Sequence, residues 1–244
     1  MRKSYEIDMC SGPLLSRILL FAIPLICSGV LQLVFNATDI IVVGRFVSSN
    51  AMAAVGSTSS LINLLVNFFI GISVGANVLV ARFRGANDFD DAQETVQTAL
   101  ITAVAGGFVL IALGILLARP MLVWMATPDE VIGQAVLYMR VYFIGMPATM
   151  LYNFGAAILR AVGDTRRPLY FLTLAGLVNV AGDLLFVLVL DMGVAGVAVA
   201  TVISQIISAT LIVLCLMRQD GMCNVNLRRM RFHRDKFLRI MQVG

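Results

Sequence analysis

The stretch LTLAGLVNVAGDLLFVLVL, Leu172–Leu190, decides the fold, because it is long and apolar enough to cross a bilayer as one helix. Pro168 and Asp191 bound it, and the only charged residue between them is Asp183, with Asn179 one helical turn earlier. A carboxylate at the centre of a membrane span costs about 2.5–3.5 kcal/mol on insertion scales. We expect a chain that carries one there to use its charge or its proton.

The composition places the whole chain in the same class. Of its 244 residues, 59% are hydrophobic and only 13% are charged, and the mean hydropathy is +0.92. Soluble domains have about 25% charged residues, so these values indicate an integral membrane protein. At about 20 residues a span plus loops, the length suits six helices. We therefore predict an all-α fold, a polytopic membrane protein with a six-helix transmembrane bundle.

Six apolar segments separated by turn signals account for most of the chain. They cover approximately residues 14–43, 53–82, 95–117, 128–161, 172–190 and 194–217. Pro24 lies inside the first segment and is expected to kink its helix, because proline removes a backbone hydrogen bond. Pro120 closes the third segment and Pro147 interrupts the fourth. The predicted organisation is a cytoplasmic N-terminus (1–13), a six-helix lobe (14–217) and a basic cytoplasmic linker (218–244).

The distribution of basic residues predicts the orientation in the membrane. With the N-terminus inside, all of the 18 Lys and Arg residues except Arg45, Arg119 and Arg140 fall at inner helix ends or in the tail. Under the positive-inside rule, both termini are then cytoplasmic. The same rule explains the net charge of +4 better than nucleic-acid binding does. The basic tail suits an amphipathic helix that lies on anionic headgroups.

Signatures of enzymes and of metal centres are missing from the sequence. The cysteines, Cys10, Cys27, Cys215 and Cys223, show no C-x-x-C spacing, and the one histidine, His233, lies in the basic tail. No zinc-protease, hydrolase or phosphate-loop motif occurs. We therefore expect that the protein is not an enzyme and that it binds no cofactor.

Asp39 and Asp183 are the only acidic residues inside the apolar segments. At about 1.5 Å per helical residue, Asp39 lies roughly 9 Å, Thr201 roughly 10 Å and Asp183 roughly 12 Å below the outer end. These residues come from the first, sixth and fifth segments, and Asn179 lies one turn deeper than Asp183. The sequence therefore predicts one polar cluster in the outer half of the bundle.

Two kinds of coupling chemistry fit this cluster. Burial disfavours a charged carboxyl group, and a second carboxyl group nearby disfavours it further. The pair would then hold a proton near neutral pH and release it when water or a cation arrives. Alternatively, the oxygens of Asp39, Asn179, Asp183 and Thr201 form a hard site for a monovalent cation such as Na⁺. The sequence does not separate proton coupling from sodium coupling.

Uncharged amides also lie inside the spans. Gln32 and Asn36 share a helical face with the first carboxyl group. An amide in a membrane helix more often makes a helix–helix hydrogen bond than it binds a ligand. We prefer that structural role for Gln32, Asn63, Asn67 and Gln205.

A specific combination of motifs covers essentially the whole chain. Pro24 precedes DIIVVGRF (39–46), and the further motifs are AMAAVG (51–56), GANVLVARFRGA (75–86), YNFGAAILRAVGDTRRP (152–168), NVAGDLLF (179–186) and GVAGVAVATVISQ (193–205). In these motifs the chain resembles the multidrug and toxic compound extrusion (MATE) transporters.

This resemblance implies a secondary active antiporter of the cytoplasmic membrane that exports organic cations and drugs in exchange for H⁺ or Na⁺. It also implies a cation site in the N-terminal lobe, a kink at Pro24 that couples protonation to substrate release, and Asn153 as a further residue of the lobe. The implied cation site consists of Asp39, Asn179, Asp183 and Thr201. The candidate polar residues of the lobe cavity are Gln32, Asn36, Asn153 and Gln205.

MATE transporters have twelve helices in two lobes, whereas this sequence predicts one lobe and a tail. Because LRIMQVG (238–244) echoes SRILLFAIP (16–24), we expect a second lobe to begin there. The expected partners are that second lobe, the bilayer and organic cations. Three alternatives stay open: a flippase of lipid-linked oligosaccharides with the same fold, a dimerising half-transporter, and a non-transporting module that assembles with a partner lobe.

Overall fold

The computed structural model describes residues 14–219, 224–225 and 230–244, so the predicted N-terminal segment 1–13 and part of the predicted linker lie outside the described residues. The described part of the chain consists of helices joined by turns and loops and contains no strand. Its elements are α1 (Leu14–Phe46), α2 (Ser49–Gly85), α3 (Phe89–Trp124), α4 (Asp129–Ile144), α5 (Met146–Ala161), α6 (Arg166–Leu184), the π-helix η1 (Leu185–Val189), α7 (Gly193–Arg218) and α8 (Arg234–Val243).

Six segments of the structure are long and apolar enough to cross a membrane. Five are α1, α2, α3, α6 with η1, and α7, and the sixth is the pair α4 and α5, between which the span bends by 51°. The break falls at Gly145, and Pro147 lies in the first turn of α5. The predicted all-α bundle of six spans, with an interrupted fourth span, is confirmed.

The ends of α3 differ from the prediction. The helix begins at Phe89, because the Asp88 side chain accepts a hydrogen bond from the Asp91 backbone N–H at 3.2 Å and caps the first turn. It also continues through Pro120 to Trp124 instead of ending before the proline. A membrane helix tolerates the loss of one backbone hydrogen bond where neighbouring groups compensate for it.

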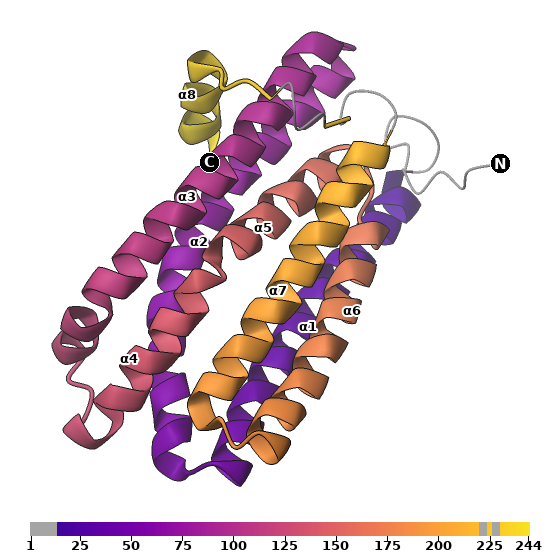
Figure 1. Ribbon diagram of the computed structural model, residues 1–244. Helices are drawn as coiled ribbons and strands as arrows, with labels where there is room; N and C mark the ends of the chain where they lie inside the picture. Colours follow the sequence, from indigo (N-terminus) through magenta and orange to yellow (C-terminus); the bar gives the residue numbers. More distant parts are fainter. Residues whose placement is uncertain (1–13, 220–223, 226–229) are drawn as a thin grey trace.

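The bundle is organised around α5. This helix packs against α2, α3 and α7, while α1 packs mainly on α2 and α6 (Figure 1). Small residues allow the close approaches that helices need in a bilayer. At Gly107 of α3, an added Cβ would overlap the Pro147 backbone, and at Gly176 of α6 it would overlap the Phe35 ring of α1.

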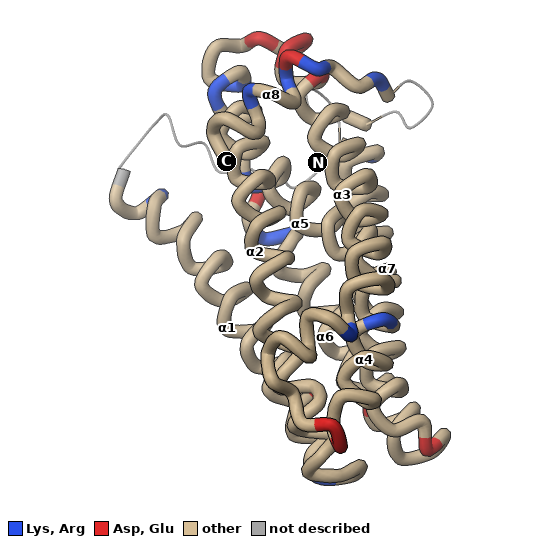
Figure 2. The backbone as a smooth tube through the Cα atoms, turned by 90° about the vertical axis from the view of Figure 1, so that its left-hand side faces the viewer, with Lys and Arg blue, Asp and Glu red and all other residues tan. Residues whose placement is uncertain are grey.

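Charged residues gather at the two ends of the bundle (Figure 2). In the described residues, Lys and Arg lie toward the end that carries both termini, apart from Arg45, Arg119 and Arg140. The sequence therefore predicts that this end is cytoplasmic.

The C-terminal helix α8 packs on α2 and α3 at the end of the bundle that carries the termini. Lys236 is buried there, with its Nζ 2.6 Å from an Asp91 carboxylate oxygen and 4.9 Å from the centre of the Phe83 ring. The buried Ile240 lies one turn further along, and its carbonyl leaves no room for a side chain at Gly75 of α2. The described part of the predicted linker is thus held on the lobe.

Candidate functional site

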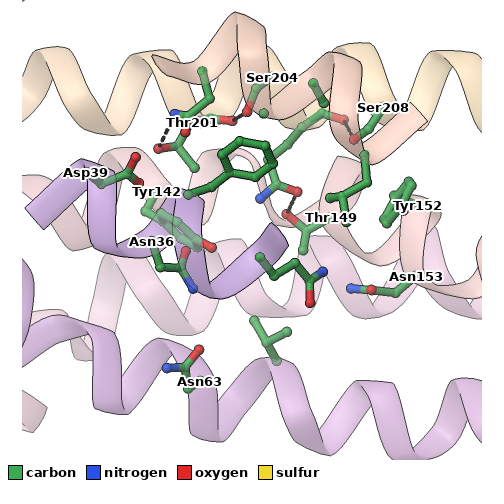
Figure 3. A pocket seen from close by; sticks show the side chains of 18 of the residues that line it. Asn36, Asp39, Asn63, Tyr142, Thr149, Tyr152, Asn153, Thr201, Ser204 and Ser208 are labelled. Atoms are coloured by element: carbon green, nitrogen blue, oxygen red, sulfur yellow. Dashed lines mark hydrogen bonds between the residues drawn. The ribbon is translucent and has the colours of Figure 1, made fainter. Parts of the chain in front are cut away.

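A polar cavity of about 190 Å³ opens inside the lobe, with walls from α1, α2, α4, α5, α6 and α7 (Figure 3). Amides, hydroxyls and aromatic rings dominate its walls, and its described lining contains one carboxyl group and no Lys or Arg. The lining residues are Gln32, Phe35, Asn36, Asp39, Asn63, Val66, Asn67, Ile70, Tyr142, Thr149, Tyr152, Asn153, Leu172, Ala175, Gly176, Asn179, Thr201, Ser204, Gln205 and Ser208.

Most of the candidate residues from the sequence lie in this cavity. The members that line it are Gln32, Asn36, Asp39, Asn153, Asn179, Thr201 and Gln205. Asp183 is fully buried beside Asp39 and does not belong to the described lining. Pro24 lies elsewhere on α1, which runs through it as a continuous helix. The kink at Pro24 stays a prediction.

The amides of α1 and α2 are exposed within the lobe. The four amides, which are exposed, all line the cavity: Gln32 and Asn36 on α1, and Asn63 and Asn67 on α2. Amides in the middle of a membrane span avoid lipid, because nothing in hydrocarbon satisfies their hydrogen bonds. Their shared face is therefore the cavity-facing side of α1 and α2.

Asp39, Asp183, Asn179 and Thr201 form one cluster at the end of the cavity where Figure 3 shows Asp39. All four side chains are buried, with exposed fractions of 6% for Asp39, 0% for Asp183, 4% for Asn179 and 8% for Thr201. Asn179 donates from Nδ2 to the Thr201 hydroxyl at 3.3 Å, and that hydroxyl donates to the Val197 carbonyl at 2.9 Å. The structure thus brings together the residues that the depth estimates placed at one level.

Three of the four oxygens of the two carboxyl groups lack a hydrogen-bond donor among the described residues. Asp39 and Asp183 are immediate neighbours, yet Asp39 Oδ1 and both carboxyl oxygens of Asp183 have no donor among the described residues. Tyr138 and Tyr142 of α4 lie within electrostatic range of Asp39. Buried polar atoms are normally hydrogen-bonded, so these oxygens are available to a proton or a cation.

Local geometry explains how α6 and α7 bring the cluster together. Asn179 and Asp183 are one turn apart on α6, and Gly182 allows α6 to approach Ala200 of α7. The π-helix η1 begins two residues after Asp183. Such π turns occur frequently at functional sites.

The other end of the cavity is held by hydrogen bonds between helices. Thr149 of α5 donates from its hydroxyl to Gln205 Oε1 of α7 at 2.7 Å. The Tyr152 hydroxyl donates to the Pro168 carbonyl of α6 at 2.9 Å. These bonds fix the bent fourth span against its neighbours, so the cavity wall is continuous from α5 to α7.

Sequence reasoning missed several lining residues. Ser204 and Ser208 follow Thr201 at helical spacings and share its face, a signal that a search for charged groups passes over. Tyr142 and Thr149 lie on either side of the Gly145 break, so no single helical period connects them. Asn63 and Asn67, which we assigned to helix–helix hydrogen bonds, also line the cavity.

Comparison with known proteins covers both sequence and fold. The profile of the MatE family matches residues 24–185. The probable multidrug resistance protein YoeA of Bacillus subtilis is 38% identical over 201 residues, which are 80% of this chain and 42% of YoeA. The probable multidrug resistance protein YpnP of the same organism is 29% identical over 200 residues, 81% of this chain and 44% of YpnP.

A solved structure has the same arrangement of helices. A crystal structure of MATE in the bent conformation superposes with a TM-score of 0.87 at 26% sequence identity, covering 93% of this chain and 51% of that protein. The chain therefore spans about half the length of the relatives that it matches. With a family match over most of its length and a shared fold, the chain belongs to the MatE family of membrane transporters.

Proposed function

We propose that the chain forms the N-terminal lobe of a secondary antiporter that exports organic cations in exchange for H⁺ or Na⁺. The observation that supports this function best is the pair Asp39 and Asp183, buried side by side with oxygens that lack donors. A buried carboxyl pair in which three of the four oxygens lack a donor is an unfavourable structural element in a membrane. It is a suitable element for binding and releasing a cation.

Either coupling ion would complete the same group of oxygens. A proton between the two carboxyl groups would supply the missing donor. A sodium ion would bind the oxygens of Asp39, Asp183, Asn179 and Thr201, which are the hard ligands that such a cation prefers. In both cases one positive charge neutralises one negative charge of the buried carboxyl pair. Binding and release of the ion therefore change the net charge at this end of the cavity.

The cavity suits an organic cation more than an anion. Its described lining has one carboxyl group, Asp39, and several aromatic rings, among them Phe35 and Tyr142, whose faces attract cations. Sites for drug-sized molecules are about 300–1,000 Å³, whereas this lobe encloses about 190 Å³. We propose that a second lobe supplies the facing wall against the exposed amides of α1 and α2.

The helix α1 is the proposed moving part. It carries Asp39 and contains Pro24, where one backbone hydrogen bond is absent. The Ser28 hydroxyl donates to the Pro24 carbonyl at 2.8 Å, and such back-bonding weakens and bends helices locally. Bending there would move Asp39 relative to Asp183 on α6, which links ion binding to the shape of the cavity.

The test uses the complete transporter in membrane vesicles. Asp183→Asn keeps the size of the side chain and removes its ability to become charged, so coupled drug efflux is expected to be lost while membrane insertion is unchanged. Asp191→Asn is the matched control, because Asp191 is exposed at the end of the same span. Imposing a pH gradient or a sodium gradient separately identifies the coupling ion. Efflux by Asp183→Asn at the level of the parent protein would rule out the proposed role of the pair.

A further inference from the structure

An apolar groove on the outside of the bundle lies apart from the polar cavity. Its volume is about 440 Å³, and every residue that lines it is aliphatic or methionine. The three helices that form it contribute Leu100, Ile101 and Val104 from α3, Leu151 from α5, and Val213 and Leu216 from α7. The helices α3 and α7 do not pack against each other, and α5 lies between them and packs on both (Figure 1).

One end of the groove lies at the end of the bundle that carries the termini. Val225 and Met230, from the segment between α7 and α8, complete its lining. The backbone next to Met230 is held in place, because the Arg231 N–H donates to Gln97 Oε1 of α3 at 3.1 Å. Met230 is therefore positioned at this end of the groove by the hydrogen bond of its neighbour to α3.

Two exposed arginines lie close in sequence to lining residues at this end of the groove. Arg231 follows the lining residue Met230, and Arg218 lies two residues beyond the lining residue Leu216 at the end of α7. Neither guanidinium has an ion-pair partner among the described residues. The nearby acids Asp91 and Glu94 are already paired with Lys236. Two unpaired positive charges thus lie where a membrane helix meets the headgroup layer.

We propose that the groove binds an acyl chain of an anionic phospholipid whose headgroup pairs with Arg218 and Arg231. The lining offers no polar partner, so the part of the ligand inside it must be hydrocarbon. The arginines at its end favour a negative charge, and basic residues next to membrane helices attract anionic lipids. A volume of about 440 Å³ falls within the range of sites for small molecules, about 300–1,000 Å³. This site is independent of the transport activity proposed above.

The experiment measures lipid retention by the purified chain in detergent, using native mass spectrometry. The probes are phosphatidylglycerol and phosphatidylethanolamine with identical palmitoyl and oleoyl chains. The parent chain is expected to retain phosphatidylglycerol in preference to phosphatidylethanolamine. Because each basic residue near the surface strengthens binding of an anionic lipid about fivefold, R218Q/R231Q is expected to reduce the preference by about 25-fold. The matched control is R119Q, an exposed arginine at the opposite end of α3, which should leave the preference unchanged.

A second pair of variants tests the groove itself. Ala105→Trp places an indole into the groove and is expected to remove the retained lipid, whereas Leu116→Trp, on the same helix and 73% exposed, should not. If far-UV circular dichroism shows that Ala105→Trp does not fold, Val213→Phe fills the groove from α7 instead. An unchanged preference in R218Q/R231Q, or parent-level retention after the groove is filled, would overturn the proposal. The proposal would also be overturned if the parent chain formed a dimer without lipid and the groove-filling variants were monomers, because a second copy would then occupy the groove.

Discussion

Replacing Gly176 with alanine is expected to force α1 and α6 apart, because the two helices touch at this glycine. A Cβ at this position would overlap the Cε2 and Cζ atoms of the Phe35 ring. Adding a methyl group to a packed interior costs about 1–3 kcal/mol. The same change also raises helix propensity, because alanine is favoured over glycine by about 1 kcal/mol. A control that shares this second effect is therefore required.

Gly29→Ala is that control, because a Cβ at Gly29 on α1 meets no atom within 4 Å. The gain in helix propensity is common to both variants. The free energy of unfolding of Gly176→Ala is therefore expected to be about 1–3 kcal/mol lower than that of Gly29→Ala. The assay is equilibrium unfolding of the chain in mixed micelles, followed by far-UV circular dichroism.

Phe35→Leu provides the decisive comparison, because leucine lacks the Cε2 and Cζ atoms that would overlap the new methyl group. Gly176→Ala combined with Phe35→Leu is expected to be more stable than the sum of the single changes, with a coupling of about 0.5–3 kcal/mol. Additive effects, or equal stability of Gly176→Ala and Gly29→Ala, would refute the close packing of α1 on α6.

Three further predictions follow from hydrogen bonds and ion pairs of the lobe. Lys236→Met removes the ion pair with Asp91, whose side chain is 36% exposed. The free energy of unfolding should fall by about 1 kcal/mol, and trypsin should cleave α8 faster than in the parent chain. Equal cleavage rates would contradict this contact. Tyr152→Phe removes the hydrogen bond to the Pro168 carbonyl and should lower the free energy of unfolding by about 1 kcal/mol, measured as above. Asn179→Ala removes a buried hydrogen bond and should lower the free energy of unfolding by only about 0.6 kcal/mol. It should nevertheless strongly reduce efflux by the complete transporter. A loss of efflux no larger than the loss of folded protein would argue for a purely structural role.

The spans and the polar cluster were predictable because both depend on local regularities. Apolar length predicts membrane spans, and the constant rise of a helix gives the depth of Asp39, Asp183 and Thr201 from the ends of their spans. The structure brings these three residues together in one cluster. What the cluster does stays a prediction, which the transport experiment above tests.

Features that depend on contacts between distant segments could not be predicted. Lys236 and Asp91 are far apart in sequence, and nothing local indicates that α8 packs on α2 and α3. The apolar segment predicted to begin near residue 95 gave no sign of the earlier part of α3, which begins at Phe89 after the cap at Asp88. The π-helix η1 was not predicted either, and neither was its close contact with α7, where a Cβ added at Gly196 would crowd Phe186.

The slight burial of α1 has a consequence for how the lobe should be handled. In its most apolar window only 11% of the residues of α1 are buried, compared with 28–39% in the other four unbroken spans. Most of its surface is therefore left uncovered by the other described helices, and its amide-free side is the part that can face hydrocarbon. Bilayer thickness and lipid shape then help to set the position of α1, at modest energies for each ångström of mismatch. Detergent micelles and membranes are consequently different environments for the helix that carries Asp39.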